Sequence, residues 1–355
     1  MIEHAYKPLF PYFGGKSRVA SVIWQALGDV PNYVEPFFGS GANLFLRPHE
    51  HHTATINDAD GFVANFWRAV KCDPAAVAEH ADNPVNECDL HARHLWLLGN
   101  RERITDRLCA DPYWFDAKAA GWWCWGLCCW IGSGWCSGSG PWQVVDGVMA
   151  KVEGSADQGV KRQRPCLGDA GRGVNRKRPC LGFARGVTRQ LPHLRPGQGV
   201  NRPGQNIREQ VEWFAHRLRS VRVCSGDWLR VCGSDTVTTK HGTTGVFLDP
   251  PYADTAKRAA KLYAVDCEQV AHRVREWCIE NGDNPKMRIV LAGYEGEHEL
   301  PTNWRKHEWK ADGGYGRVSE SGRANAKKER LWFSPHCLEV EGESVTSELF
   351  AEAAR

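Results

Sequence analysis

The sequence lacks any long hydrophobic run, and it has no strong excess of charge of one sign. No apolar stretch among its 355 residues is long enough to cross a bilayer, and its first residues do not have the pattern of a signal peptide. We therefore expect a cytoplasmic protein. The formal net charge is only +3, so the overall charge neither indicates nor excludes a nucleic-acid partner.

Paired cysteine motifs are missing as well. The 14 cysteines are scattered through a long chain, which favours reduced thiols over a disulfide framework. Cys124, Cys128, Cys129 and Cys136 do cluster, so a zinc site has to be considered. No Cys-x-x-Cys pair or histidine partner completes such a site. We expect buried thiols packed among tryptophans, and no bound metal.

The glycine-rich segment 32–45 has neither the full dinucleotide fingerprint nor a phosphate-binding loop with Gly-Lys-Ser. The segment 32–45 instead predicts a short strand, a glycine-rich turn and a helix. Such a turn lets a ligand approach the backbone, and the amino end of the helix offers free N–H groups. This combination favours a nucleotide-like cofactor without a phosphate chain.

An acidic residue ends the next predicted strand. The segment 54–58 reads as a strand that finishes at Asp58, and a helix is predicted over residues 59–71. In nucleoside-binding α/β folds an acid at this place hydrogen-bonds the ribose hydroxyls. Asp58 could equally be the N-cap of the following helix.

The strongest local signal is Asp249-Pro-Pro-Tyr252, which follows the apolar run 246–248. Two consecutive prolines cannot continue a strand ladder, so the chain leaves the sheet at its carboxyl edge, where open α/β sheets bind ligands. The Asp249 carboxylate, the Pro250 carbonyl and the Tyr252 ring suit a flat heterocycle with an exocyclic amine. The simpler alternative is a turn that ends a strand.

In this order, four segments resemble the motifs of the Dam-like (alpha-class) DNA adenine-N6 methyltransferases, of a phage or prophage type: 10–16, 33–41, 56–60 and 249–252. The resemblance covers roughly residues 7–71 and 221–337. It implies the α/β, Rossmann-like sheet of an S-adenosylmethionine-dependent methyltransferase, with seven strands of which one is an antiparallel edge strand. A helical or irregular inserted target-recognition region is implied as well. It also implies a bacterial cell or a phage-infected bacterium as the setting.

By position, the resemblance implies cofactor contacts from Tyr12, Lys16, Glu35, Phe37, Gly39, Gly41, Asp58, Asp227, Trp228 and Asp249. The family often has tryptophan where Tyr12 stands, and the tyrosine keeps an aromatic face. Asp227 would accept the adenine amine of the cofactor, with Trp228 as an apolar wall. Alternatively, Asp227 caps the turn after its strand.

The resemblance implies catalysis by Asp249, Pro250, Pro251 and Tyr252, and DNA phosphate contacts from a basic loop near the end of the chain: Arg323, Lys327 and Lys328. A solvated run of charge is the alternative for that loop.

In the middle of the chain, three acids that each precede a helical stretch, Asp73, Asp89 and Asp111, predict helix starts. The predicted helices cover residues 74–82, 89–109 and 112–131. We expect the tryptophans of the third helix to pack in a core rather than form a base-stacking platform. A flexible connector is predicted over 131–140. Arginine-rich repeats of 13 to 14 residues then fill 159–204; they contact DNA phosphates, or they are a neutral expansion.

Four regions are expected: a cofactor-binding half (1–72), an inserted target-recognition region (73–208), a catalytic half (209–340) and a flexible tail (341–355). The expected enzyme is a site-specific methyltransferase that transfers a methyl group from S-adenosylmethionine to N6 of adenine in double-stranded DNA, by base flipping. Restriction-modification is one setting; replication marking and phage protection are others. Alternatives are a cytosine-N4 methyltransferase, or a non-catalytic DNA-binding protein with a vestigial domain.

Overall fold

The computed structural model describes residues 8–12, 14–49, 52–130, 134–136, 142–145, 148–151, 207–233, 238–251, 267–309 and 329–340. Several predictions fall outside these ranges, namely the repeats of 159–204, Tyr252, the basic-loop residues Arg323, Lys327 and Lys328, and the tail 341–355.

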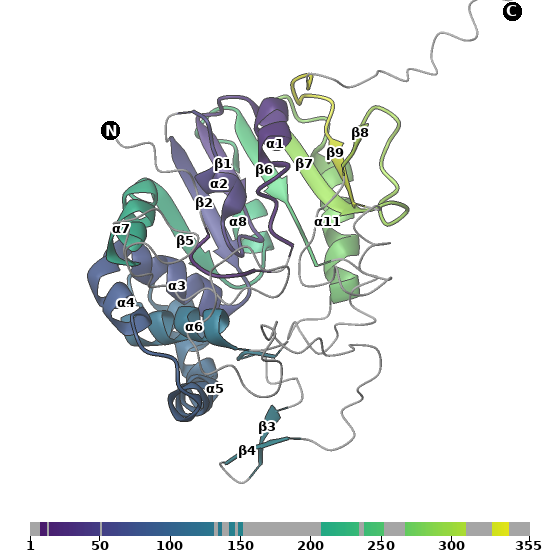
Figure 1. The fold of residues 1–355 in the computed structure, drawn as a ribbon. Coiled ribbons are helices and arrows are strands. Elements are labelled where there is room, and N and C mark those ends of the chain that lie inside the picture. The colour runs from purple at the N-terminus through teal and green to yellow at the C-terminus, as the bar shows by residue number, and fades with distance from the viewer. Residues whose placement is uncertain are drawn as a thin grey trace, which may run out of the picture.

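A seven-stranded sheet forms the centre of the molecule (Figure 1). Across the sheet the strands are β5 (Val221–Ser225), β2 (Thr53–Asp58), β1 (Asn32–Glu35), β6 (Thr244–Leu248), β7 (Met287–Tyr294), β9 (Glu329–Phe333) and β8 (Arg305–Glu308). Pairing is parallel from β5 to β7, while β9 runs antiparallel to both of its neighbours. The predicted α/β, Rossmann-like sheet is therefore confirmed.

The position of the antiparallel strand differs from the prediction. It was expected at the edge, but β9 lies between β7 and β8. The reason is the connection: β8 and β9 are consecutive in the chain and pair as antiparallel neighbours, and β9 fills the place next to β7. The edge strand β8 consequently runs parallel to the main direction of the sheet.

Helices cover both faces of the sheet, and each face has its own hydrophobic core. Strand β6 shows the division, because Phe247 packs in one core while Val246 and Leu248 pack in the other, as alternate residues of a strand must. One core contains side chains of α1 (Ala20–Leu27), α2 (Ala42–Phe45) and α3 (Gly61–Cys72); the other contains those of α8 (Leu229–Cys232) and α11 (Cys267–Asn281).

A helical layer packs on α3, visible at the lower left of Figure 1. Its helices are α4 (Pro74–Ala81), α5 (Glu87–Ala110), α6 (Ala117–Cys129) and α7 (Ile207–Arg217), and a hairpin of β3 (Trp142–Val145) and β4 (Val148–Lys151) follows α6 in the chain. None of the described helices is both long enough and apolar enough for a membrane span.

The tryptophans and cysteines around α6 are core residues, as predicted. Trp123 and Trp125 are buried, whereas Trp114 and Trp122 are partly buried against the same core. The clustered cysteines are buried free thiols: Cys124, Cys128, Cys129 and Cys136. Within the described part of the chain, no three histidine, cysteine or acidic side chains gather as metal ligands.

Two of the three predicted helix starts are wrong. Asp73 caps α4 as expected, but α5 begins earlier, where the Asn86 side chain rather than that of Asp89 is the cap. Helix α6 begins later and is capped by Asp116. The carboxylate of Asp111 closes a local turn instead, so the Asp-Pro pattern there marks a turn and not a helix.

The predicted flexible connector is packed where it is described. Trp135 is 8% exposed and its Nε1 donates to the Trp123 carbonyl at 3.0 Å. Its indole lies so close to Gly126 of α6 that a Cβ on that glycine would be 1.8 Å from a ring atom. A large aromatic side chain thus holds residues 134–136 against the helix despite the glycine-rich sequence around it.

Replacing Gly126 with alanine should destabilise the fold by about 1–3 kcal/mol, because the added methyl overlaps the Trp135 ring and the indole has to move. The matched control is Gly99→Ala in α5, where an added Cβ meets no atom within 4 Å. That variant should be neutral or gain up to about 1 kcal/mol from helix propensity. Urea unfolding of both variants measures the difference; equal stabilities would contradict the packing described here.

Candidate active site

The candidate site lies at the carboxyl edge of the parallel strands. There β5, β2, β1 and β6 end side by side, so residues that follow these strands meet although they are far apart in sequence. The chain order reverses between β1 and β6, since β2 follows β1 on one side and β6 returns to its other side. Such a reversal is where open α/β sheets bind ligands.

An ion pair joins the first and last predicted motifs. The Lys16 Nζ donates to Asp249 Oδ2 at 2.8 Å and to the Gly14 carbonyl at 3.0 Å. The lysine side chain is 3% exposed and the aspartate side chain 18%. Lys16, expected from the resemblance to contact a cofactor, thus neutralises the acid of the predicted catalytic tetrapeptide in this structure.

Asp58 organises the glycine-rich turn after β1. Its Oδ2 accepts from the Gly39 N–H and its Oδ1 from the Asp60 N–H, both at 2.9 Å. The alternative of Asp58 as the N-cap of α3 is wrong, because Asp60 is that cap and accepts from the Phe62 N–H. Tyr12 covers the same turn: a Cβ on Gly39 would lie 2.4 Å from its ring.

The glycines of this turn are required by conformation and by space. Gly39 and Gly41 have φ of 49° and 68°, in the region that side chains disfavour. A Cβ on Gly41 would lie 2.4 Å from the Phe38 ring and 2.5 Å from the Phe45 ring. The Trp67 indole donates to the Gly39 carbonyl at 2.8 Å. The turn is therefore held at both the N–H and the carbonyl of Gly39, by Asp58 and Trp67 respectively.

The end of β5 contributes an aromatic wall and an exposed acid. Trp228 is buried and its ring centroid lies 6.1 Å from that of Phe37, with 33° between the planes. Asp227 is exposed; its Oδ1 accepts from the Leu229 N–H at 2.8 Å and its Oδ2 lies 3.4 Å from an Arg273 nitrogen. The capping contact considered for Asp227 is thus present, and the carboxylate remains open to solvent.

Glu35 lies behind the site as a buried, hydrogen-bonded acid. Its Oε2 accepts a hydrogen bond from the Tyr33 hydroxyl at 2.8 Å. The Tyr33 hydroxyl oxygen in turn accepts one from the Asn43 amide at 2.7 Å. Burial raises the pKa of Glu35 well above its ordinary value, and the charges of Asp249 and Asp58 raise it further. Burial and the neighbouring acids therefore both disfavour the charged form of Glu35.

Part of the chain that forms this edge is similar to known proteins. Residues 12–94 match the family of D12 class N6 adenine-specific DNA methyltransferases. The match confirms the resemblance drawn from the motifs, over a segment that includes Tyr12, the glycine turn and Asp58.

One curated relative is the Type II methyltransferase M.MjaIII of Methanocaldococcus jannaschii. It is 30% identical over 89 residues, which are 23% of this chain and 31% of the relative. The chain thus matches about a third of the length of that relative, and the similarity is confined to one part of each protein.

Sequence reasoning missed two residues at this edge. The Asn57 amide donates to the carbonyls of Pro36 and Gly226 and so ties the ends of β1 and β5 together. Glu329, the first residue of β9, has its Oε2 3.9 Å from Lys16 Nζ. Its only sequence signal is an acid at the point where a basic run meets an apolar strand.

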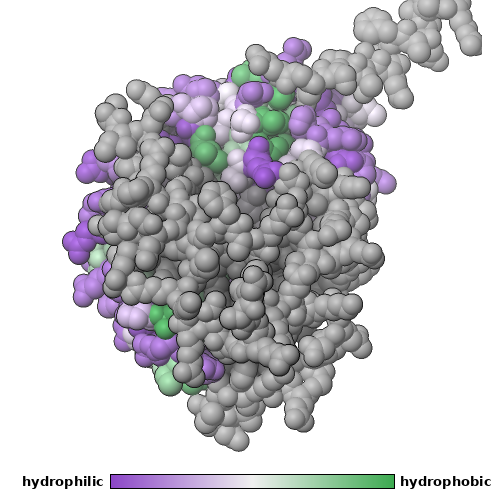
Figure 2. Space-filling model, viewed as in Figure 1, coloured by the Kyte–Doolittle hydropathy of each residue, from purple (hydrophilic) through white to green (hydrophobic). Residues whose placement is uncertain are grey.

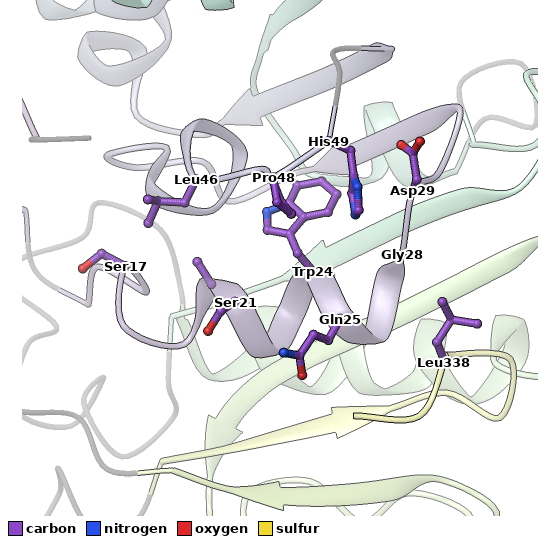
Figure 3. Close-up of a pocket in the computed structure, with 11 residues that line it drawn as sticks. Ser17, Ser21, Trp24, Gln25, Gly28, Asp29, Leu46, Pro48, His49 and Leu338 are labelled. Carbon is purple, nitrogen blue, oxygen red and sulfur yellow. The ribbon is translucent and has the colours of Figure 1, made fainter. Parts of the chain in front are cut away.

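A shallow groove elsewhere contains none of the predicted catalytic or cofactor residues (Figure 3). It has a volume of about 610 Å³ and follows α1 from Ser17 to Asp29, with Trp24 and His49 on its wall and Leu338 at one end. Figure 2 shows an apolar patch over this part of the surface. Gly28 and Asp29 precede β1, so one end of the groove reaches the amino end of the sheet, and neither Lys16 nor Asp249 lines it.

Asp58 should make stability depend on pH. Burial raises its pKa to about 7 from an ordinary 3.8, although the N–H groups of Gly39 and Asp60 act in the opposite direction. Between these two values the folded state keeps a proton that the unfolded state has lost, so the free energy of unfolding falls as pH rises through this window. Asp58→Asn cannot titrate and should flatten that dependence.

Urea unfolding across the window measures the slope for the wild type and the variant. Asp106→Asn, which removes an exposed carboxylate from α5, is the control and should keep the wild-type slope. The slope should decrease without vanishing in Asp58→Asn, because burial also raises the pKa of Asp60 and Glu35. An unchanged slope would show that Asp58 is ionised in the folded protein.

Proposed function

We propose that this protein is a site-specific DNA methyltransferase that transfers a methyl group from S-adenosylmethionine to N6 of adenine in double-stranded DNA. The observation that carries the proposal is the ion pair between Lys16 and Asp249, because in it the lysine of the first motif contacts the acid of the tetrapeptide at the strand edge that also holds the glycine turn. The match of residues 12–94 to an adenine-specific family supports adenine over cytosine as the target.

The residues around the turn fit the nucleoside part of the methyl donor. Trp228 is buried, yet its indole N–H has no hydrogen-bond partner in the described part of the chain, which is a sign of a polar ligand beside it. Asp227 offers an exposed acceptor for an amine. Asp58 is partly exposed, and its oxygens keep lone pairs for ribose hydroxyls beyond the two N–H bonds.

In the proposal, Lys16, Glu35, Phe37, Gly39 and Gly41 complete the cofactor-binding edge, with Tyr12 over the turn. When bound, S-adenosylmethionine supplies a methyl group that is activated by its positive sulfur. The protein then has to supply position and electrostatics rather than a nucleophile.

Asp249 and Pro250 would hold the target amine. The Asp249 carboxylate and the Pro250 carbonyl accept its two N–H bonds, which directs the nitrogen lone pair away from the ring. Pro251 keeps the chain extended there, and Tyr252 stacks on the base. Because an adenine inside a duplex cannot reach these groups, it has to rotate out of the stack, at a cost of a few kcal/mol.

DNA contacts are assigned to other parts of the chain. We infer that the region 73–208 recognises the target sequence, and that its arginine-rich repeats at 159–204 neutralise phosphates. Arg323, Lys327 and Lys328 would contact phosphates beside the rotated base. Under this proposal the insertion determines which adenines are methylated, and the sheet carries out the transfer.

Removing the Asp249 carboxylate should abolish methylation while cofactor binding persists. Asp249→Ala tests this, and Asp249→Asn is the sharper variant because its amide oxygen still accepts from the buried Lys16. We expect a fall in the transfer rate of about 10²–10³-fold, since one preorganised acceptor of the target amine is lost. Labelled methyl donor and DNA, followed by digestion to nucleosides, measure the rate and identify the modified base.

The control for this experiment is Asp283→Asn, a carboxylate close to the start of β7 and therefore at the opposite edge of the sheet. It should transfer methyl groups at the wild-type rate. Calorimetric titration with S-adenosylmethionine shows whether each variant still binds the donor. Full activity in Asp249→Asn would overturn the role assigned to Asp249, and label recovered in cytosine would overturn the choice of base.

A further inference from the structure

Glu329 is a buried carboxylate at the candidate active site that the function above does not use. Strand β9 is antiparallel to β7, so its first residue lies opposite Tyr294, the last residue of β7, at the carboxyl edge of the sheet. Glu329 is 9% exposed. Its Oε2 lies 3.9 Å from the Lys16 Nζ, which itself lies 2.8 Å from Asp249.

The carboxylate is poorly compensated. Its Oε2 accepts no hydrogen bond from the residues that the structure describes. Burial raises the pKa of Glu329, Lys16 lowers it, and Asp249 raises it. The neighbouring Arg330 guanidinium turns to Glu295 and Glu308 instead. A buried acceptor without a donor is unfavourable, and such groups are commonly retained for function.

The proposed function creates a need for such an acceptor. Lys16 occupies Asp249 Oδ2, one of the oxygens that has to accept an N–H of the target amine. An amine that takes this oxygen leaves the Lys16 ammonium buried with one bond fewer, which is unfavourable unless another acceptor is near. A movement of about 1 Å would bring Lys16 Nζ within hydrogen-bond distance of Glu329 Oε2.

We propose that Glu329 is a positioning residue that accepts the Lys16 ammonium when the target amine takes its place at Asp249. The inference rests on the proposed function and adds a residue to it. Before the target enters, Lys16 neutralises Asp249; afterwards it neutralises Glu329, and Asp249 Oδ2 accepts from the amine in place of the ammonium. No bond is made or broken in this exchange, and no proton leaves Lys16.

The test is the charge-neutral variant Glu329→Gln in the full chain. Its maximal methylation rate should fall by about tenfold or more, because a neutral amide holds an ammonium less well than a carboxylate does. The KM for S-adenosylmethionine should stay within about twofold, since Glu329 is not one of the proposed cofactor contacts and Lys16 remains in place. Glu308→Gln removes an exposed acid of β8 that also contacts Arg330, and it should behave as the wild type.

The pH profile separates this role from a purely structural one. Glu329 has to be ionised to receive Lys16, so wild-type activity should fall as pH decreases through its pKa, which burial places above the ordinary 4.5. Glu329→Gln should lose that part of the profile. Glu329→Asp keeps the charge on a shorter side chain and should be faster than Glu329→Gln; equal rates in these two variants would overturn the proposal.

A double-mutant cycle with Lys16→Met tests whether Glu329 acts through the lysine. In that background Glu329→Gln should reduce the rate little further, because the ammonium is already gone. The proposal is overturned if Glu329→Gln has the wild-type rate and pH profile, or if it causes the same fold loss with and without Lys16. A wild-type chain that methylates no DNA at all would overturn the proposed function itself, and the inference with it.

Discussion

The parallel pairing of β1 with β6 is the constraint on which the site depends. Its register joins Asn32 to Thr244 and Val34 to Val246, residues separated by the whole helical layer and the repeats. Closing so long a loop is entropically unfavourable, but the cost grows only slowly with length, and both strands are fully buried between the two cores. The same pairing brings the ends of the two strands together, so that Glu35 and Asp249 become neighbours.

Electrostatic compensation at that edge follows from the same crowding. Glu35, Asp58, Asp249 and Glu329 come from the ends of different strands, and Lys16 lies within ion-pair distance of two of them, Asp249 and Glu329. Each acid is stabilised in its own way: Glu35 accepts a hydrogen bond from the Tyr33 hydroxyl, Asp58 accepts two backbone N–H bonds, and Asp249 accepts from the Lys16 ammonium. Glu329 has the weakest compensation. Uneven compensation of this kind is typical of sites where binding a ligand completes the interactions.

Features encoded by short-range patterns could be predicted from the sequence. The apolar run before Asp249, the glycine turn and the Asp-Pro start of α4 each have a local physical cause, and the structure has them in place. Features decided by tertiary contacts could not. Asn86 and Asp116 replaced the expected caps because nearby alternatives fitted the packing, and Trp135 anchored a segment whose composition indicates flexibility. The position of Glu329 beside Lys16 could not be predicted, because it depends on where β9 lies in the sheet.

The helical layer is fixed to the sheet by more than hydrophobic packing. Arg68 of α3 is buried, and its guanidinium donates to the carbonyls of Asp111 and Trp114 in the turn after α5 and to that of Val223 in β5. One side chain thus joins three elements, and its charge is solvated by backbone dipoles instead of a carboxylate. Because α4 and α6 also pack on α3, this part of the insertion cannot turn as a separate body without exposing the shared core. If this helical layer contacts the DNA, its position relative to Asp249 is therefore set by the shared core.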